Sequence, residues 1–266
     1  MTNTHLKIRD KIMHLELDED QITQAAMLDA FNHGQCYEPA TSAFLAHVLK
    51  EGDTFVDVGA HVGYFSCLAG VLVAPSGRVY SFEPDAYNFL ALRKNRSLNG
   101  VNATDTNSIE VMAPVGDRDQ EFEVYVNKDN DGGHSLWNPG IHPFNVRSAK
   151  EVCTHTMRMV RLDQFKFPDT VRLMKIDTEG CELATLVGCG DMLKNGVFRN
   201  VILEINTFAL EQMRGSEMAI RRLMREAGYS TYLLESWPPI KMRDDQEYPS
   251  PNVYNLLFSL DEVPHA

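Results

Sequence analysis

Short apolar runs alternate along the chain with longer segments of helical period, a pattern typical of α/β proteins. The apolar runs predict strands at TFVDV (54–58), RVYSFE (78–83), SIEVMAPVG (108–116), VRLMKID (171–177), VILEIN (201–206), STYLLE (230–235) and VYNLLFSL (253–260). Helices are predicted at 21–31, 39–49, 86–98 and 217–228, and directly after the fourth strand. We therefore expect a Rossmann-like, doubly wound α/β fold, with a mostly parallel seven-stranded sheet and helices on both faces.

Two segments are not needed to build this sheet. Residues 118–162 contain EFEVYV and THTMRMVRL, which predict a small β insert before the fourth strand. Residues 1–36 are expected to form an N-terminal helical cap. Both segments are natural places for a lid or for a pocket that holds a second substrate. We expect residues 1–266 to form a single domain, with the 118–162 insert near that pocket.

Composition excludes several classes of protein. The chain has 266 residues, of which 44% are apolar, and a net charge of −12. Such an acidic chain lacks the Lys and Arg surplus that grips nucleic acid. No apolar run approaches the roughly 20 residues of a membrane span, and the first residues lack the apolar core of a signal peptide. The five cysteines form no C-x-x-C pair, which favours reduced thiols and a cytoplasmic location.

The stretch DTFVDVGAHVGYFS (53–66) predicts a buried strand, a glycine-bounded turn and a helix. The dinucleotide fingerprint G-x-G-x-x-G fails here, because only its first glycine, Gly59, is present. What remains is Asp57 at the strand end, with Gly59 and Gly63 in the turn. Glu83 ends the next strand, where a carboxylate can bind both hydroxyls of a ribose. The alternative is a plain strand–turn–helix with an incidental glutamate.

The arrangement resembles class I S-adenosylmethionine-dependent methyltransferases, and the chain looks like a member of their FkbM-type family. The resemblance spans roughly residues 37–206 and rests on DVGAHVGYFS (57–66), SFEPDAYNFLALRKNRSLNG (81–100), APVGD (113–117), GGHSL (132–136) and LMKIDTEGCELATLVG (173–188). The last block is the most specific. His61 departs from the family's usual asparagine, and Pro114 stands where a small residue is usual.

The resemblance implies S-adenosylmethionine as the cofactor. The residues expected to bind it are Tyr37, Glu38, Asp57, Gly59, Ala60, His61, Gly63, Glu83, Val115, Asp177 and Glu179. His61 is expected to pack against the methionine part of the cofactor, with a role as a base as the alternative. Tyr37 and Glu38 match the family pattern and are expected to close over the same end. Their alternative is a simple helix start, favoured by the helix dipole.

Two residues are candidates for catalysis. Asp177 ends the fourth strand beside the expected methyl group, where it can orient an acceptor or take its proton; the alternative is a cap for the next helix. His134 lies in a turn-rich segment and could act as a base near neutral pH, or form local hydrogen bonds only. Glu182 is expected to tether a loop or to pair with a basic side chain such as Lys175.

A metal is not expected. Glu204 and Asn206 end the fifth strand, and some metal-dependent O-methyltransferases hold Mg²⁺ with acids and an asparagine from such strand ends. Our preferred interpretation is that they shape the acceptor pocket without Mg²⁺.

The predicted function is methyl transfer to a hydroxyl of a small-molecule acceptor of sugar or natural-product type. The alternatives are N-methylation of a peptide or amide nitrogen, and a non-catalytic nucleotide-binding protein of the same fold. A nicotinamide-dependent oxidoreductase is disfavoured by the failed fingerprint. No nucleic-acid partner is expected, and the oligomeric state stays open, a homodimer being one alternative.

Overall fold

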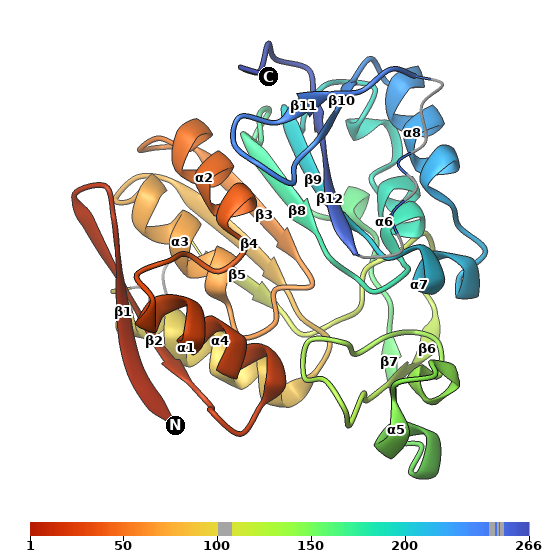
Figure 1. Ribbon diagram of the computed structural model, residues 1–266. Helices are drawn as coiled ribbons and strands as arrows, with labels where there is room; N and C mark the ends of the chain where they lie inside the picture. The colour runs from red at the N-terminus through yellow and green to blue at the C-terminus, as the bar shows by residue number, and fades with distance from the viewer. Residues whose placement is uncertain (101–107, 245–247, 249, 251–252, 266) are drawn as a thin grey trace.

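The central sheet of the computed structural model contains eight strands within residues 1–100, 108–244, 248, 250 and 253–265, which are the residues that the structure describes (Figure 1). In spatial order these are β11 (Ile240–Lys241), β10 (Ser230–Leu233), β12 (Tyr254–Ser259), β9 (Asn200–Ile205), β8 (Leu173–Ile176), β3 (Thr54–Val58), β4 (Arg78–Phe82) and β5 (Ser108–Val111). The strands from β9 to β5 run parallel, and β12 pairs antiparallel with β9 and β10. The mostly parallel α/β sheet is confirmed. The expected count of seven is wrong, because the two-residue strand β11 extends the edge beyond β10.

Two apolar cores cover the two faces of the sheet, because successive side chains of a strand point to opposite faces. Phe55 and Val79 belong to the core under α2 and α3, whereas Val56 and Val58 belong to the core under α6 and α8. No helix among the described residues is long and apolar enough to cross a membrane. The helices are α1 (Ile22–Asn32), α2 (Pro39–Val48), α3 (Tyr64–Val73), α4 (Ala86–Leu98), α5 (Val146–Lys150), α6 (Glu182–Gly188), α7 (Thr207–Gln212) and α8 (Glu217–Glu226), with 3₁₀ turns η1 (Pro139–Ile141), η2 (Leu162–Gln164) and η3 (Gly190–Met192).

The N-terminal segment is not the helical cap that we expected. It forms an antiparallel hairpin of β1 (Thr2–Ile8) and β2 (Lys11–Leu17), and only then the helix α1. The reason is a period of two: Met13, Leu15 and Leu17 alternate with exposed or half-exposed residues and are buried. Their face of β2 packs against α3 and α4, and α1 lies next to the hairpin (Figure 1). The helix at 21–31 is confirmed within one residue at each end.

The insert before β8 contains the β structure that its pattern predicted. β6 (Glu121–Tyr125) and β7 (Thr154–Arg158) pair antiparallel as a separate two-stranded sheet. The connection between them carries η1 and α5. Strand β5 is shorter than predicted, ending at Val111, and Val115 instead forms an isolated bridge with Val160 of the insert. Residues 112–116 are therefore the link between the sheet and the insert.

Candidate functional site

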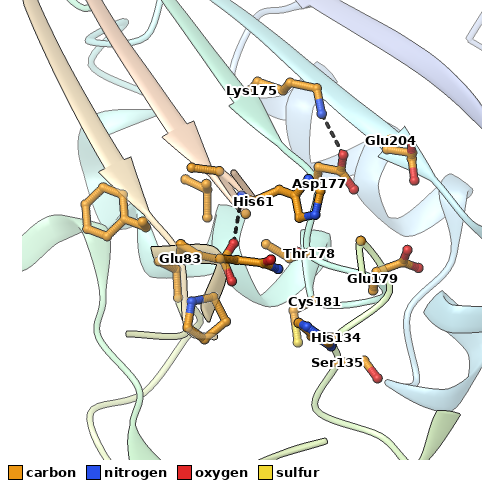
Figure 2. A pocket seen from close by; sticks show the side chains of 18 of the residues that line it. His61, Glu83, His134, Ser135, Lys175, Asp177, Thr178, Glu179, Cys181 and Glu204 are labelled. Carbon is orange, nitrogen blue, oxygen red and sulfur yellow. Dashed lines mark hydrogen bonds and ion pairs between the residues drawn. The ribbon is translucent and has the colours of Figure 1, made fainter. Parts of the chain in front are cut away.

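One pocket lies over the carboxyl ends of β3, β4, β8 and β9 (Figure 2). Val58 of β3 is level with the last residues of β4 and β8. Gly59, Glu83 and Asp177 therefore leave the sheet together, at the edge where doubly wound sheets bind ligands. Segments outside the sheet complete the pocket: Thr23 and Met27 of α1, Tyr37 and Glu38 before α2, and Asn130, Gly132, His134, Ser135 and Leu136 of the insert.

The glycine turn after β3 needs its glycines because neighbouring strands and helices leave no room for a side chain. A Cβ on Gly59, whose φ is +81°, would lie 1.7 Å from the carbonyl oxygen of Asp177. A Cβ on Gly63, whose φ is +89°, would lie 2.5 Å from Cδ1 of Leu92 on α4. The backbone N–H groups of Gly59 and Ala60 both donate to the carbonyl of Phe82 at 2.9 Å. The turn is thus fixed between β8, β4 and α4.

Two of the expected cofactor residues support the turn without lining the pocket. Asp57 is 1% exposed, and its carboxylate accepts a hydrogen bond from Oγ of Ser66 at 2.6 Å. Burial raises the pKa of Asp57 to about 6, against the nearby positive charge of Lys175. Neither Asp57 nor Gly63 lines the pocket. Their contribution is to hold the turn in place. The other residues expected to bind the cofactor do line the pocket: Tyr37, Glu38, Gly59, Ala60, His61, Glu83, Val115, Asp177 and Glu179.

Glu83 is held at the end of β4 by backbone groups on both sides. Its Oε2 accepts the N–H of His61 at 2.7 Å, and its Oε1 accepts the N–H of Asp85 at 2.8 Å. The residue is 4% exposed, and burial raises the pKa of its carboxyl to about 7 although both N–H groups act to lower it. The carboxylate has lone pairs left for a ligand, because each oxygen can accept more than one hydrogen bond.

A buried ion pair stands at the end of β8 (Figure 2). Nζ of Lys175, a residue 2% exposed, donates to Oδ2 of Asp177 at 2.6 Å. The same ammonium lies 3.9 Å from Oε1 of Glu38 and 4.6 Å from the ring centroid of Phe65. Burial alone would lower the pKa of Lys175, but the carboxylates of Asp177, Glu38 and Glu204 outweigh it and raise the pKa well above its usual value. Lys175 therefore stays charged and fixes one oxygen of Asp177.

Three carboxylates meet around this ammonium. Oxygens of Glu38, Asp177 and Glu204 all lie within 4.8 Å of one another. Burial, together with the charge of Asp177, raises the pKa of Glu204 well above its usual value. The magnesium alternative relied on Asn206, whose Oδ1 instead accepts the N–H of Ala209 and caps α7. The three acids could together hold a metal ion, and two of them, Glu38 and Asp177, face the ammonium of Lys175.

The loop after β8 is held by Glu182 and presents Glu179 to the pocket. Oε1 of Glu182 accepts the N–H groups of Thr178 and Gly180 at 3.0 and 3.1 Å. This confirms the interpretation of Glu182 as a loop tether, whereas Lys175 pairs elsewhere. Glu179, at a φ of +49°, accepts the side-chain amide of Asn206 at 3.1 Å. Burial, and then the charges of Asp177 and Glu182, raises the pKa of Glu179 to about 8.

His134 lines the pocket, and its ring forms a local hydrogen bond. Nδ1 accepts the backbone N–H of Asn127 at 3.0 Å, so the neutral ring carries its proton on Nε2. Nε2 lies 3.9 Å from Oδ1 of Asp85. Burial lowers the pKa of His134, which favours this neutral form. A local hydrogen bond, the alternative that we gave for His134, is thus present, and its role as a base stays a prediction.

Sequence reasoning missed the ion pair of Lys175 and the contacts of Asp131, whose carboxylate accepts hydrogen bonds from Thr23, Gln24 and His61. A lysine inside the apolar run LMKI is itself a signal, because a charge in a buried strand requires a partner. Asp131 gives no comparable signal, since its segment DNDGG is typical of any polar turn. Thr23 and Met27 on α1 were also missed, because their place depends on the packing of the N-terminal hairpin.

The doubly wound sheet, the glycine-bounded turn and the carboxylate on the neighbouring strand define an α/β protein with a ligand pocket at the carboxyl edge of its sheet. A family model described as the methyltransferase FkbM domain matches residues 57–231, which is more than half of the chain. The chain belongs to the FkbM methyltransferase family, and the resemblance noted in the sequence is confirmed.

Solved structures resemble the chain at low sequence identity. A methyltransferase FkbM from Methylobacillus flagellatus is 15% identical with a TM-score of 0.48, over 82% of this chain and 50% of that one. The chain thus spans half the length of that protein. A precorrin-6y C5,15-methyltransferase from Geobacter metallireducens is 13% identical with a TM-score of 0.45, over 92% of both chains. TYW2 from M. jannaschii, solved with AdoMet, is 13% identical with a TM-score of 0.44, over 97% of this chain and 85% of that one. No curated protein sequence matches the chain.

Proposed function

We propose that the protein is an S-adenosylmethionine-dependent methyltransferase that methylates a hydroxyl of a small-molecule acceptor of sugar or natural-product type. The observation that carries the proposal is the continuity of one pocket from Glu83 to Asp177, with the Lys175 ion pair at its far end. Family membership supports methyl transfer. The acceptor class rests on Asp177 as a fixed proton acceptor.

The residues present fit the cofactor. The pocket has an apolar wall beside Glu83, formed by Phe82, Pro84, Pro114 and Val115. Such a wall suits an adenine, next to the ribose that Glu83 would bind. The turn at Gly59 brings backbone close to the ligand without a side chain in between. At the other end the carboxylates of Glu38, Asp177 and Glu204 suit the positive charges of the methionine part. When bound, the cofactor supplies a methyl group already activated by the sulfonium.

The chain then has to align the acceptor, exclude water and take a proton. Bound here, S-adenosylmethionine would give its methyl carbon to the acceptor oxygen, its carbon–sulfur bond would break, and S-adenosylhomocysteine would be the product to leave. The hydroxyl proton passes to Asp177, whose Oδ2 is held by Lys175 and whose Oδ1 is the oxygen left for the acceptor. We propose that no divalent metal takes part, because the Lys175 ammonium already pairs with Asp177 and faces Glu38.

Binding and transfer are tested separately. Titration calorimetry with S-adenosylhomocysteine tests the cofactor site, and we expect a single binding site per chain. Screening hydroxylated and amine-bearing small molecules for uptake of a radiolabelled methyl group tests the acceptor class. Absence of S-adenosylhomocysteine binding would refute the proposed function. Methyl uptake confined to amines would refute only the hydroxyl assignment.

A further inference from the structure

Asp131, in the insert, joins three separate segments of the chain with one carboxylate. Its Oδ1 accepts the backbone N–H of Thr23 at 2.8 Å. Its Oδ2 accepts Nε2–H of Gln24 at 3.0 Å and Nε2–H of His61 at 2.9 Å. The residue is 6% exposed. Burial acts to raise the pKa of Asp131, but the hydrogen bonds and the charge of His61 outweigh it and hold the pKa at about 2.

The contact with His61 reaches the ribose end of the pocket. The ring of His61 donates to Asp131, while the backbone N–H of the same residue donates to Oε2 of Glu83 at 2.7 Å. His61 has a φ of +51°, an uncommon conformation for a residue with a side chain. The carboxylate of Asp131 thus anchors the residue whose backbone positions Glu83.

The contacts with Thr23 and Gln24 hold α1 across the pocket. Thr23 and Met27, one turn apart on α1, both line the pocket. Oγ1 of Thr23 also donates to Oδ1 of Asn130 at 2.7 Å, next to the Asp131 contact. The helix precedes residues 57–231, the part that matches the family model. Its position on the insert depends on the contacts with Asn130 and Asp131.

The insert is itself held by a contact with α4. Nδ2 of Asn88 on α4 donates to the backbone carbonyl of Asp131 at 2.9 Å. This contact uses the backbone of Asp131 and is independent of its carboxylate. Removing the carboxylate should therefore release α1 and His61 while the insert loop keeps its place.

We propose that Asp131 is a positioning residue of the cofactor site, which retains the bound cofactor by holding α1 and His61 against the pocket. The inference rests on the proposed function, since it takes S-adenosylmethionine to be the occupant. Because α1 covers part of the pocket, the release rate of the ligand depends on how often this helix moves away from the pocket. Loss of the carboxylate removes the two hydrogen bonds that hold α1 in the closed state, and it also removes the bond to the ring of His61.

The test is the dissociation rate of S-adenosylhomocysteine, measured by stopped-flow displacement, for the full-length protein and its variants. Asp131→Ala should release the ligand about 10–100-fold faster, the effect of one or two charge-assisted hydrogen bonds. His61→Asn, which removes only the ring contact, should give a smaller acceleration. Because both variants remove the same contact, their effects should not add in the double variant.

Asp129→Ala is the matched control, because Asp129 lies in the same loop but accepts the N–H groups of Arg147 and Ser148 instead. It should leave the release rate within about twofold of that of the wild type. Amide exchange of residues 22–32 gives a second readout: S-adenosylhomocysteine should slow it in the wild type but not in Asp131→Ala. Melting temperatures verify that each variant is folded.

The outcomes separate the two proposals. A wild-type protein that does not bind S-adenosylhomocysteine refutes the proposed function and this inference with it. Binding by the wild type, with release from folded Asp131→Ala as slow as from the wild type, overturns the inference alone. Equal acceleration by Asp129→Ala also overturns it, because a general loosening of the loop would then account for the effect.

Discussion

Replacing Asp177 by asparagine tests the centre of the proposed mechanism. The amide keeps the size of the side chain but removes both its basicity and the charge that faces Lys175 at 2.6 Å. Loss of a general base lowers turnover by about 100–10,000-fold. We therefore expect methyl transfer to fall into that range, while S-adenosylhomocysteine still binds through Glu83 and the glycine turn.

The same substitution should also lower the free energy of unfolding, by an amount that follows from the exposure and the partners of the ion pair. Removing one partner of a buried ion pair costs about 3–5 kcal/mol. Lys175 is buried, but Asp177 is 24% exposed at its side chain and Glu38 remains 3.9 Å from the ammonium. We expect a loss of about 1–3 kcal/mol, less than a fully buried pair shows, because Asp177 is partly exposed and Glu38 still faces the ammonium. For a chain of this size the melting temperature should drop by about 2–10 °C.

A double variant separates the two effects. Lys175→Met with Asp177→Asn removes both charges of the pair but leaves Glu38 without its cation, so the melting temperature should recover part of its loss whereas turnover should stay low. Turnover is measured as release of S-adenosylhomocysteine with an acceptor found by the methyl-uptake screen. Near-normal turnover of a folded Asp177→Asn protein refutes the assignment of the base. Recovery of turnover in the double variant refutes it too, because charge balance rather than basicity would then be what transfer requires.

Three further predictions follow from the same pocket. Glu83→Ala should weaken S-adenosylhomocysteine binding about 10–100-fold in calorimetry, as expected for a lost charge-assisted pair; unchanged affinity would contradict the ribose role. Activity should survive EDTA, and its loss with recovery on adding Mg²⁺ would show that Glu38, Asp177 and Glu204 hold a metal. Burial raises the pKa of Glu83 from 4.5 to about 7 and that of Glu179 from 4.5 to about 8. The folded chain then binds these protons more tightly than the unfolded chain, so the free energy of unfolding should fall as the pH rises from about 4.5 to 8. Glu179→Gln should flatten this fall, measured as melting temperature against pH, and an unaltered slope would contradict the raised pKa of Glu179.

The sequence predicts the part of the site that local rules control. Gly59 and Gly63 stand out because a turn between a buried strand and a helix restricts which residues fit, and the structure shows that Asp177 and Leu92 leave no space for a Cβ. Glu83 is foreseeable because it ends a strand that must lie beside β3. Both inferences need only the sheet order and the end of each strand.

The parts that could not be predicted depend on contacts between distant segments. The hairpin β1–β2 is the exception, because the alternation of Met13, Leu15 and Leu17 with polar residues is a local signal that our expectation of a helical cap overlooked. Asp131 meets Gln24 from 107 positions away. Asp57 was expected in the pocket because it ends β3, yet its side chain turns to Ser66. No local pattern distinguishes the outcomes for Asp131 and Asp57, since each is decided by which surface packs against the residue.

The position of Glu38 shows why the pocket cannot be understood from the family-matched residues alone. Glu38 precedes the matched segment, yet its Oε1 faces Lys175 and its Oε2 accepts the amide of Asn255 at 3.3 Å. It therefore links α2, the centre of the sheet at β8 and the start of β12. Lys175 is charged because Glu38 and Asp177 both face it, and Asp177 is oriented because Lys175 is charged. The N-terminal segment thus contributes to the electrostatics of the strand end that we assign to catalysis, in addition to covering the opposite side of the pocket through α1.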